Sequence, residues 1–274
     1  MTARLIAGPW VGEFGWELMS WQGYVRAASE NFDETICFAP EGHRALYDDF
    51  ADRFVPVRVS GGVRDCWKLE GAASEKFRLN MAVSGFDGAR LQPSGFVSPS
   101  EQKFIRFGDP SKASARYDLL FHVRGPIGKK KNHAWSIEFA ERVAEILLDD
   151  GLSGATIGSP AQSLNLRGMA DLRGMALGAL MNEIAAAGVV VGPSSGPMHL
   201  ASLCGTPHVV WTDKAYYSAA GCTNRDRYER IWNPLNAPVD VIDDFGWSPP
   251  AAIVVDCVRR MLCLSSKTRS SRST

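Results

Sequence analysis

Residues 189–211 hold the pattern that most restricts the possible folds of this chain. An apolar strand is expected at 189–191, and it runs into a Gly/Pro/Ser loop that opens directly into a helix. A second apolar strand, expected at 208–211, follows that helix. Short apolar strands that alternate with helices are typical of βαβ units, in which the strands are parallel neighbours in one sheet. The segment therefore predicts an α/β fold.

Both halves of the chain show this alternation. In the first half, strands are expected at 4–7, 35–39 and 54–59, with helices at 14–32 and 41–51. In the second half, further strands are expected at 118–123 and 155–157, with helices at 136–150, 177–187 and 249–264. The sequence thus predicts two parallel sheets, one in each half.

A stretch rich in serine, proline, glycine and lysine at 93–115 separates the two halves. This composition is typical of a linker, and we place the domain boundary inside it. We expect one Rossmann-like domain over 1–113, a second over 114–264, and a disordered tail over 265–274. The predicted fold class is α/β, with two Rossmann-like domains whose parallel sheets face a central cleft.

Composition excludes several classes of protein. Hydrophobic residues make up 45% of the 274 residues, which excludes collagen-like, disordered and disulfide-dense chains. The 30 basic residues balance the 30 acidic ones, which excludes a globally basic nucleic-acid binder but leaves a local basic groove open. No apolar run approaches the roughly 20 residues that span a bilayer, and the apolar start is too brief for a signal peptide. We therefore expect a cytoplasmic protein without a transmembrane segment.

The cysteines and histidines form no metal-binding pattern. Six cysteines lie far apart without a Cys-x-x-Cys pair, and the five histidines do not supply the spacing of a metal site either. We therefore expect free thiols in a reducing compartment, no metal and no other cofactor.

The loop that follows the strand at 189–191 is a candidate anion site. A helix start presents unpaired N–H groups and the positive end of the helix dipole, and both favour phosphate. Ser194 and Ser195 add hydroxyl donors, and Gly196 permits close approach of the backbone. His199 lies within the first helical turn and could reach the same anion. An ordinary strand–helix turn with a capping serine and a buried histidine explains this local pattern equally well.

A second candidate anion site follows the strand at 118–123. Arg124 is suited to a two-pronged contact with a diphosphate, and Lys130 and Lys131 supply further positive charge. A solvated loop is the usual explanation of a lysine run. Because both candidate loops follow strands of one predicted sheet, they share its carboxyl edge, where open α/β sheets bind ligands. This shared edge favours a diphosphate site.

Two glutamates follow the first predicted strand. Glu13 lies in a loop between Gly12 and Gly15, whereas Glu17 lies about one turn into the next helix. A carboxylate that faces the cleft could remove a proton from an acceptor hydroxyl. Either glutamate could instead complement the positive end of the helix dipole, and this interpretation is favoured for Glu17.

These segments together resemble the bacterial lipopolysaccharide heptosyltransferases and their relatives, glycosyltransferase family 9, which have the two-Rossmann-domain (GT-B) fold. Residues 194–201, Ser-Ser-Gly-Pro-Met-His-Leu-Ala, are similar to the family motif Asp-Ser/Thr-Gly-x-x-His-x-Ala. Residues 131–139 are similar to its Lys-x-Trp-Pro-x-x-x-Phe segment. Gly12 and Glu13 match the family's Gly-Asp pair, whose acid is taken as the catalytic base.

A second resemblance lies inside the first. His122-Val-Arg124-Gly125 is similar to the His-x-Arg-x-Gly-Asp segment of GDP-fucose-using fucosyltransferases, in which the arginine holds the donor diphosphate. Two acids of the heptosyltransferase pattern are replaced: its motif aspartate by Ser194, and an acidic residue that contacts the donor ribose by Gly178. The donor base and the sugar therefore stay open.

The resemblance implies a metal-independent inverting glycosyltransferase that moves a sugar from a nucleoside-diphosphate donor to a hydroxyl acceptor. It implies an N-terminal acceptor domain and a C-terminal donor domain, with Glu13 and Glu17 as the candidate catalytic residues. The implied donor-diphosphate ligands are Arg124, Lys130, Lys131, Ser194, Ser195, Gly196 and His199. The acceptor stays open among a glycan, a lipid-linked glycan, a small molecule and a modified nucleic acid. A catalytically silent nucleotide-sugar binder is the alternative function, and a two-domain epimerase is a third.

Overall fold

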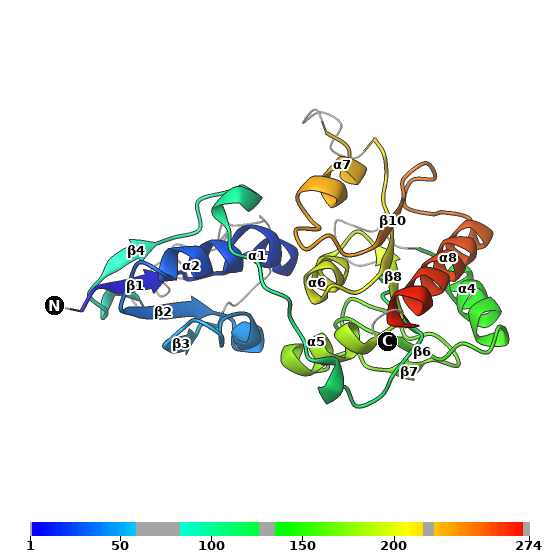
Figure 1. Cartoon of the computed structure of the whole chain (residues 1–274), viewed down its shortest axis with the longest axis horizontal. Helices are drawn as coiled ribbons and strands as arrows, with labels where there is room; N and C mark the ends of the chain where they lie inside the picture. Colours follow the sequence, from blue (N-terminus) through cyan, green and yellow to red (C-terminus); the bar gives the residue numbers. More distant parts are fainter. Residues whose placement is uncertain (1, 59–82, 126–134, 216–221, 271–274) are drawn as a thin grey trace. The chain divides into compact units, whose positions relative to one another are not determined.

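The computed structural model describes residues 2–58, 83–125, 135–215 and 222–270 (Figure 1). The chain divides into two compact units, Met1–Ile105 and Arg106–Thr274, termed unit 1 and unit 2 below. Each unit carries its own sheet, and the strands that pair in each sheet are parallel. The predicted α/β fold with two parallel sheets is therefore confirmed. The central cleft stays a prediction.

Unit 1 holds a four-stranded sheet with the strand order β3-β2-β1-β4. The strands are β1 Arg4–Ala7, β2 Glu34–Ala39, β3 Arg53–Pro56 and β4 Ala89–Leu91. The central strands β1 and β2 are almost wholly buried, as expected for parallel strands with covered faces. The sequence pattern did not predict β4, which is short and mostly exposed and therefore lacks the apolar run of the other strands.

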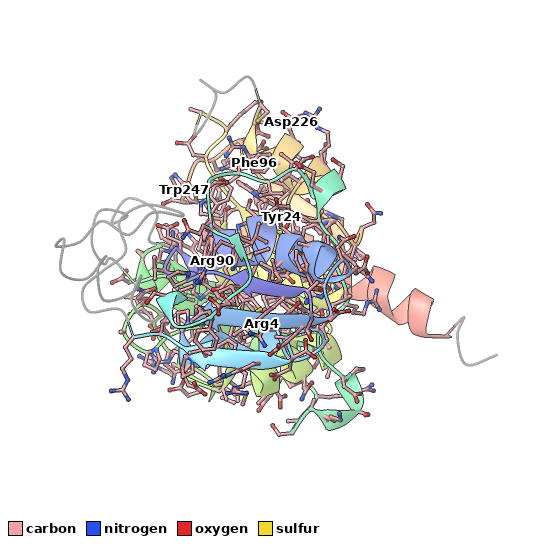
Figure 2. All side chains as sticks on the ribbon, turned by 90° about the vertical axis from the view of Figure 1, so that its left-hand side faces the viewer. Arg4, Tyr24, Arg90, Phe96, Asp226 and Trp247 are labelled. Carbon is pink, nitrogen blue, oxygen red and sulfur yellow. The ribbon has the colours of Figure 1, made fainter. Side chains whose placement is uncertain are left out.

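Two arginines of this sheet make polar contacts with neighbouring segments of unit 1. Nε of Arg4 lies 2.6 Å from Oε2 of Glu34, so an ion pair joins the first residues of β1 and β2. Arg90 of β4 donates to the carbonyl of Val83 at 2.7 Å. Figure 2 labels both arginines on the face of unit 1 that it shows. Such half-exposed contacts contribute little to the free energy of folding, and they chiefly fix the local geometry.

The helix predicted at 14–32 is two helices, α1 Phe14–Ser20 and α2 Gln22–Ser29. The prediction of one continuous helix was wrong because Trp21 leaves the helical conformation, with φ −129° and ψ −62°. This turn buries the Trp21 indole, which stacks on Trp10 at 5.8 Å between ring centroids. The helix predicted at 41–51 is likewise shorter, a 3₁₀ helix η1 over Glu41–Leu46.

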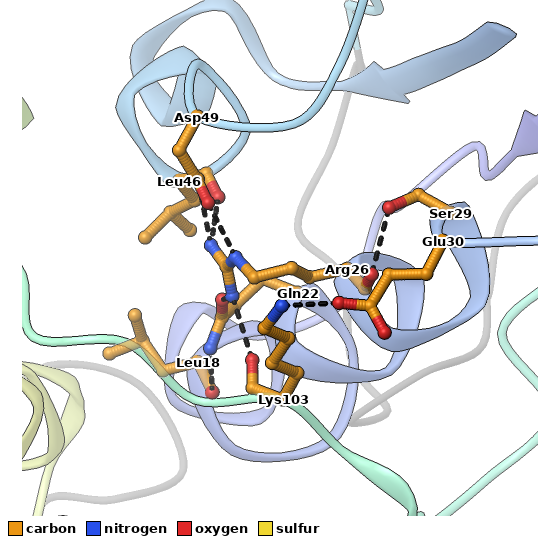
Figure 3. Close-up of polar contacts among 8 residues, drawn as sticks. All are labelled: Leu18, Gln22, Arg26, Ser29, Glu30, Leu46, Asp49 and Lys103. Atoms are coloured by element: carbon orange, nitrogen blue, oxygen red, sulfur yellow. Dashed lines mark hydrogen bonds and ion pairs between the residues drawn. The ribbon is translucent and has the colours of Figure 1, made fainter. Parts of the chain in front are cut away.

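A buried arginine fixes α2 against the segment around η1 (Figure 3). The guanidinium of Arg26 contacts both carboxylate oxygens of Asp49, at 2.7 and 3.0 Å. It also donates to the carbonyls of Leu46 and Lys103, each at 3.1 Å. Since these partners come from separate segments of unit 1, Arg26 fixes the position of η1 relative to the two helices.

Unit 2 holds a six-stranded sheet with the order β10-β9-β8-β5-β6-β7. Its strands are β5 Leu119–Phe121, β6 Gly154–Thr156, β7 Ala170–Asp171, β8 Val189–Pro193, β9 His208–Trp211 and β10 Val239–Ile242. Its helices are α4 Ile137–Asp149, α5 Leu177–Ala186, α6 Gly196–Cys204, α7 Asn224–Arg230 and α8 Ala251–Ser270. The strands predicted at 118–123, 155–157, 189–191 and 208–211 all occur, while β7, β10 and α7 were not predicted.

The core of unit 2 lies between the sheet and the helices α4 and α8, which lie side by side (Figure 1). Alternate residues of β5, β8 and β9 face this core, as the two-residue period of a strand requires. The helix predicted at 136–150 is confirmed as α4. Ser136 caps it by accepting from the Phe139 amide at 3.3 Å, and Gly151 follows it with φ +81°.

The last helix, α8, extends past its predicted end at 264 and reaches Ser270. Residues 265–270 of the expected tail thus continue α8, and the remainder at 271–274 lies outside the described residues. The disordered tail stays a prediction. No proline or glycine interrupts this stretch of sequence, so nothing in it ends a helix. Among the helices that the structure describes, none is both long enough and apolar enough to cross a membrane.

Candidate functional site

The carboxyl edge of the unit 2 sheet gathers the predicted donor-binding loops. β5, β8 and β9 are adjacent strands, so the segments that follow them begin side by side. Arg124 follows β5 and Ser194 follows β8, as the sequence predicted. The Ser194 amide donates to the carbonyl of Trp211 at 2.8 Å, which fixes its loop beside the end of β9.

The α6 helix start has the open geometry that an anion site needs. Ser195 is its N-cap, in an extended conformation, and its side chain caps no backbone amide. The Ser195 hydroxyl is buried and has no hydrogen-bond partner among the described residues. A buried hydroxyl without a partner is costly, and the role of this group as a donor to an anion stays a prediction. Gly196 is the first residue of α6, and Pro197 occupies its first turn.

Tyr228 of α7 lies at this edge too, although no local sequence pattern pointed to it. Its hydroxyl lies 3.3 Å from the hydroxyl of Ser194. Burial raises the pKa of Tyr228, while Ser194, the Arg124 charge and the Ser195 backbone act in the opposite direction. Tyr228 therefore lies beside Ser194, at the end of β8.

His199 packs in an aromatic cluster under the start of α6. Its ring stacks on Tyr228, with 5.5 Å between centroids, and lies 5.0 Å from the ring of Trp232. Only 8% of His199 is exposed. This packing matches the interpretation as a buried histidine that supports the helix start, and direct contact with an anion stays a prediction.

Backbone contacts hold the described part of the Arg124 loop, in which Arg124 supplies the positive charge. The Gly125 amide donates to the carbonyl of Gln162 at 2.9 Å, next to the bridge between Arg124 and Ser163. Burial, with a smaller contribution from the Arg124 charge, lowers the pKa of His122 to about 4, so His122 is neutral near pH 7. Lys130 and Lys131 lie outside the described residues.

The two predicted glutamates of unit 1 have different surroundings. Gly12 precedes Glu13, the half-buried residue before α1, and Gly15 lies in the first turn. The Glu13 carbonyl accepts from the Trp16 and Glu17 amides, each at 3.1 Å, so Glu13 begins the helix. Its role as a base stays a prediction.

Glu17 is fully buried, with both carboxylate oxygens engaged. Oε1 accepts from the hydroxyl of Tyr47 at 2.6 Å, and Oε2 lies 2.5 Å from Nδ1 of His43. The Trp21 side chain in turn hydrogen-bonds the Tyr47 hydroxyl. Each carboxylate oxygen of Glu17 thus has a partner within unit 1, and the role of Glu17 as a catalytic residue stays a prediction. The sequence pattern did not reveal His43 or Tyr47, because neither belongs to a local motif.

His43 is the accessible member of this group. Burial alone would lower the pKa of His43, but the charge and the hydrogen bond of Glu17 prevail and raise it above 6.5. Its side chain is 24% exposed and its ring lies 5.2 Å from that of Phe14. Within the described ranges, no group of three or more His, Cys, Asp and Glu side chains could hold a metal ion.

Solved structures of known proteins are similar to the structure of this chain. No family model and no curated protein matches the sequence. The glycosyltransferase family 9 structure from Veillonella parvula DSM 2008 is 10% identical, with a TM-score of 0.64 over 96% of this chain and 97% of that chain. E. coli ADP-heptose lps heptosyltransferase II is 14% identical, with a TM-score of 0.64 over 96% and 99%.

A third solved structure, E. coli heptosyltransferase WaaC with ADP, is 12% identical to this chain. Its TM-score is 0.52, over 94% of this chain and 99% of that chain. All three similarities extend over nearly the whole length of both chains. The chain therefore shares its fold with the family 9 glycosyltransferase and the two heptosyltransferases.

Proposed function

We propose that this chain is a metal-independent, inverting glycosyltransferase that moves a sugar from a nucleoside-diphosphate donor to a hydroxyl acceptor. The observation that carries the proposal is the group of Arg124, Ser194, Ser195 and the α6 start at one sheet edge. The fold is that of proteins named as sugar transferases, one of which was solved with ADP.

Unit 2 has the chemistry to bind the donor diphosphate. The guanidinium of Arg124 offers paired donors that match phosphate oxygens, and the first turn of α6 offers backbone N–H groups and a positive dipole end. The buried hydroxyl of Ser195 adds a donor that lacks an acceptor among the described residues. Lys130, Lys131 and His199 complete the ligand set that we propose from the sequence.

The reaction is a single displacement. The acceptor oxygen attacks the anomeric carbon, the bond from that carbon to the phosphate oxygen breaks, and its electron pair leaves with the nucleoside diphosphate. One displacement inverts the anomeric centre. Arg124 and the α6 start stabilise the negative charge that develops on the leaving group, which removes the need for a metal ion.

The acceptor hydroxyl must also lose a proton. Two groups of unit 1 are candidates for the base that takes up this proton. They are the carboxylate of Glu13 and the imidazole of His43, which Glu17 holds in place. The acceptor molecule is a glycan, a lipid-linked glycan, a small molecule or a modified nucleic acid. A silent nucleotide-sugar binder remains the alternative function, because Ser194 and Gly178 replace two acids of the family pattern.

Thermal unfolding with a panel of nucleotides tests the proposal without knowledge of the acceptor. ADP, GDP, UDP and dTDP, followed by their sugars, are added at saturating concentration. A bound ligand at about 100 times its dissociation constant stabilises a protein by about 2.7 kcal/mol, which gives a clear rise in Tm. We expect one nucleotide to raise the Tm and its sugar to be turned over. If none raises the Tm, the donor assignment is wrong; binding without turnover identifies a silent binder.

A further inference from the structure

The buried carboxylate of Glu17 needs an explanation that the fold alone does not give. None of its side chain is exposed, although removing a carboxylate from water costs several kcal/mol unless partners compensate. Its partners are one neutral hydroxyl, from Tyr47, and one imidazole, from His43. A hydrophobic side chain would fill the same space without this cost. The arrangement therefore points to a function for the imidazole.

The contact with Glu17 orients His43. When the imidazole is neutral, Nδ1 must carry the proton to hydrogen-bond the carboxylate, which leaves Nε2 as the basic nitrogen. No residue in the described ranges forms a hydrogen bond with Nε2. The side chain is also partly exposed. His43 thus combines a fixed tautomer with a nitrogen that is available to a ligand.

The pair also lies where a parallel sheet binds its ligands. β1 and β2 are neighbours, and α1 and η1 follow their respective carboxyl ends. Glu17 comes from α1 and His43 from η1. The carboxyl edge of an open α/β sheet is the usual place of its ligand site.

We propose that His43 is the catalytic residue that accepts the proton of the acceptor hydroxyl, and that Glu17 is its positioning residue. This inference rests on the proposed sugar transfer. As the acceptor oxygen bonds to the anomeric carbon, its proton moves to Nε2 of His43. The Nδ1 proton stays between His43 and Glu17, whose negative charge stabilises the imidazolium. The nucleoside diphosphate leaves with the electron pair of the broken bond.

The surroundings of His43 favour this role over a purely structural one. Glu17 and Tyr47 face it from the interior, and the ring of Phe14 packs beside it. The charged residues of its own helix, Glu41 and Arg44, pair with each other at 3.6 Å. Glu17 is thus the charge that acts on His43. Glu13 begins α1 through its backbone carbonyl, and its carboxylate caps no amide of that helix.

The test compares five variants on the nucleotide sugar that gives the largest thermal shift, with water as the acceptor. His43→Gln is expected to lower kcat by about 100-fold to 10,000-fold, the usual contribution of a general base, with the donor KM unchanged. Glu17→Gln is expected to lower kcat and to move the acidic limb of the pH profile to lower pH, because the imidazolium loses its counter-charge. Glu41→Gln is the matched control, two residues from His43 and exposed, and is expected to match the wild type.

The fourth variant, Glu13→Gln, separates the two candidate bases. Wild-type turnover in His43→Gln together with a large loss in Glu13→Gln would overturn the inference and assign the proton to Glu13. Rescue distinguishes catalysis from structure: added imidazole is expected to restore turnover to His43→Ala, and a variant that stays folded but is not rescued contradicts the proposal. A wild type that neither binds nor turns over any nucleotide sugar refutes the proposed function itself. Histidine NMR then still reports whether His43 carries its proton on Nδ1.

Discussion

The hydroxyl of Tyr47 lies 2.6 Å from a carboxylate oxygen of Glu17, in the interior of unit 1. The two residues come from the segments that follow the neighbouring strands β1 and β2. Together with His43, they form a polar group that joins α1 to η1 and to the residue after η1. A buried polar group of this kind specifies one packing arrangement, because each member is costly without its partners.

Tyr47→Phe is expected to destabilise unit 1. The substitution keeps the ring but removes a donor from a buried carboxylate, and such a loss costs about 1–3 kcal/mol. Urea unfolding measures the difference. Tyr24→Phe on α2 is the control, because its half-buried side chain is without a hydrogen bond among the described residues. If both variants lost the same unfolding free energy, the hydrogen bond from Tyr47 to Glu17 would contribute nothing specific to stability.

The stability of the protein is expected to depend on pH through His43. Glu17 raises the pKa of His43 above its usual value of 6.5, so the folded state binds the proton more tightly than the unfolded state. The resulting stabilisation is fully present below pH 6.5 and is lost as the pH rises through the pKa of the folded state. The difference in unfolding free energy between the wild type and Glu17→Gln should therefore shrink over this range.

Urea titrations at a series of pH values from about 6 to 9 measure this difference. Two other histidines do not interfere, since burial lowers the pKa of His122 and of His208 to about 4. A difference that is constant across the range would show that the Glu17–His43 contact does not favour the imidazolium.

Arg124→Ala is expected to weaken the binding of the preferred nucleoside diphosphate. A lost charge-assisted hydrogen bond of about 1.5–3 kcal/mol corresponds to about a 10-fold to 150-fold rise in Kd. Isothermal titration calorimetry measures the affinity. Arg142→Ala on α4 is the control, because its exposed side chain pairs only locally with Glu145. Equal affinity of the wild type and Arg124→Ala would remove Arg124 from the diphosphate site.

Gly158→Ala is expected to disturb the loop that supports Arg124. Gly158 has φ +119°, and a Cβ there would lie 2.8 Å from both Nδ1 of His122 and Oγ of Ser163. Strained backbone costs about 1–3 kcal/mol, and the steric conflict adds to it. Gly151→Ala is the control, since its φ is also positive but no atom lies within 4 Å of the added Cβ. In thermal unfolding, Gly158→Ala should lower the Tm more than Gly151→Ala does.

The sequence by itself determined the elements that local pattern specifies. The Ser136 cap and the glycine after α4 fix both ends of that helix, and the apolar run at β9 gives a buried strand at its predicted residues. The alternation of such elements predicted two parallel sheets and brought the Arg124 and Ser194 loops to one edge. Each of these features depends on neighbours within a few residues or on the topology that they impose.

Only the tertiary structure decided which side chains meet. Trp21 interrupts the helix predicted at 14–32 in order to pack on Trp10. His43 meets Glu17 across 26 residues of chain, and Tyr228 meets Ser194 across 34. Short-period patterns carry no record of such pairs, since a hydrogen bond between distant residues depends on how whole elements pack. The place of the Arg124 and Ser194 loops at one sheet edge could therefore be predicted from the sequence, whereas the partners of Glu17 could not.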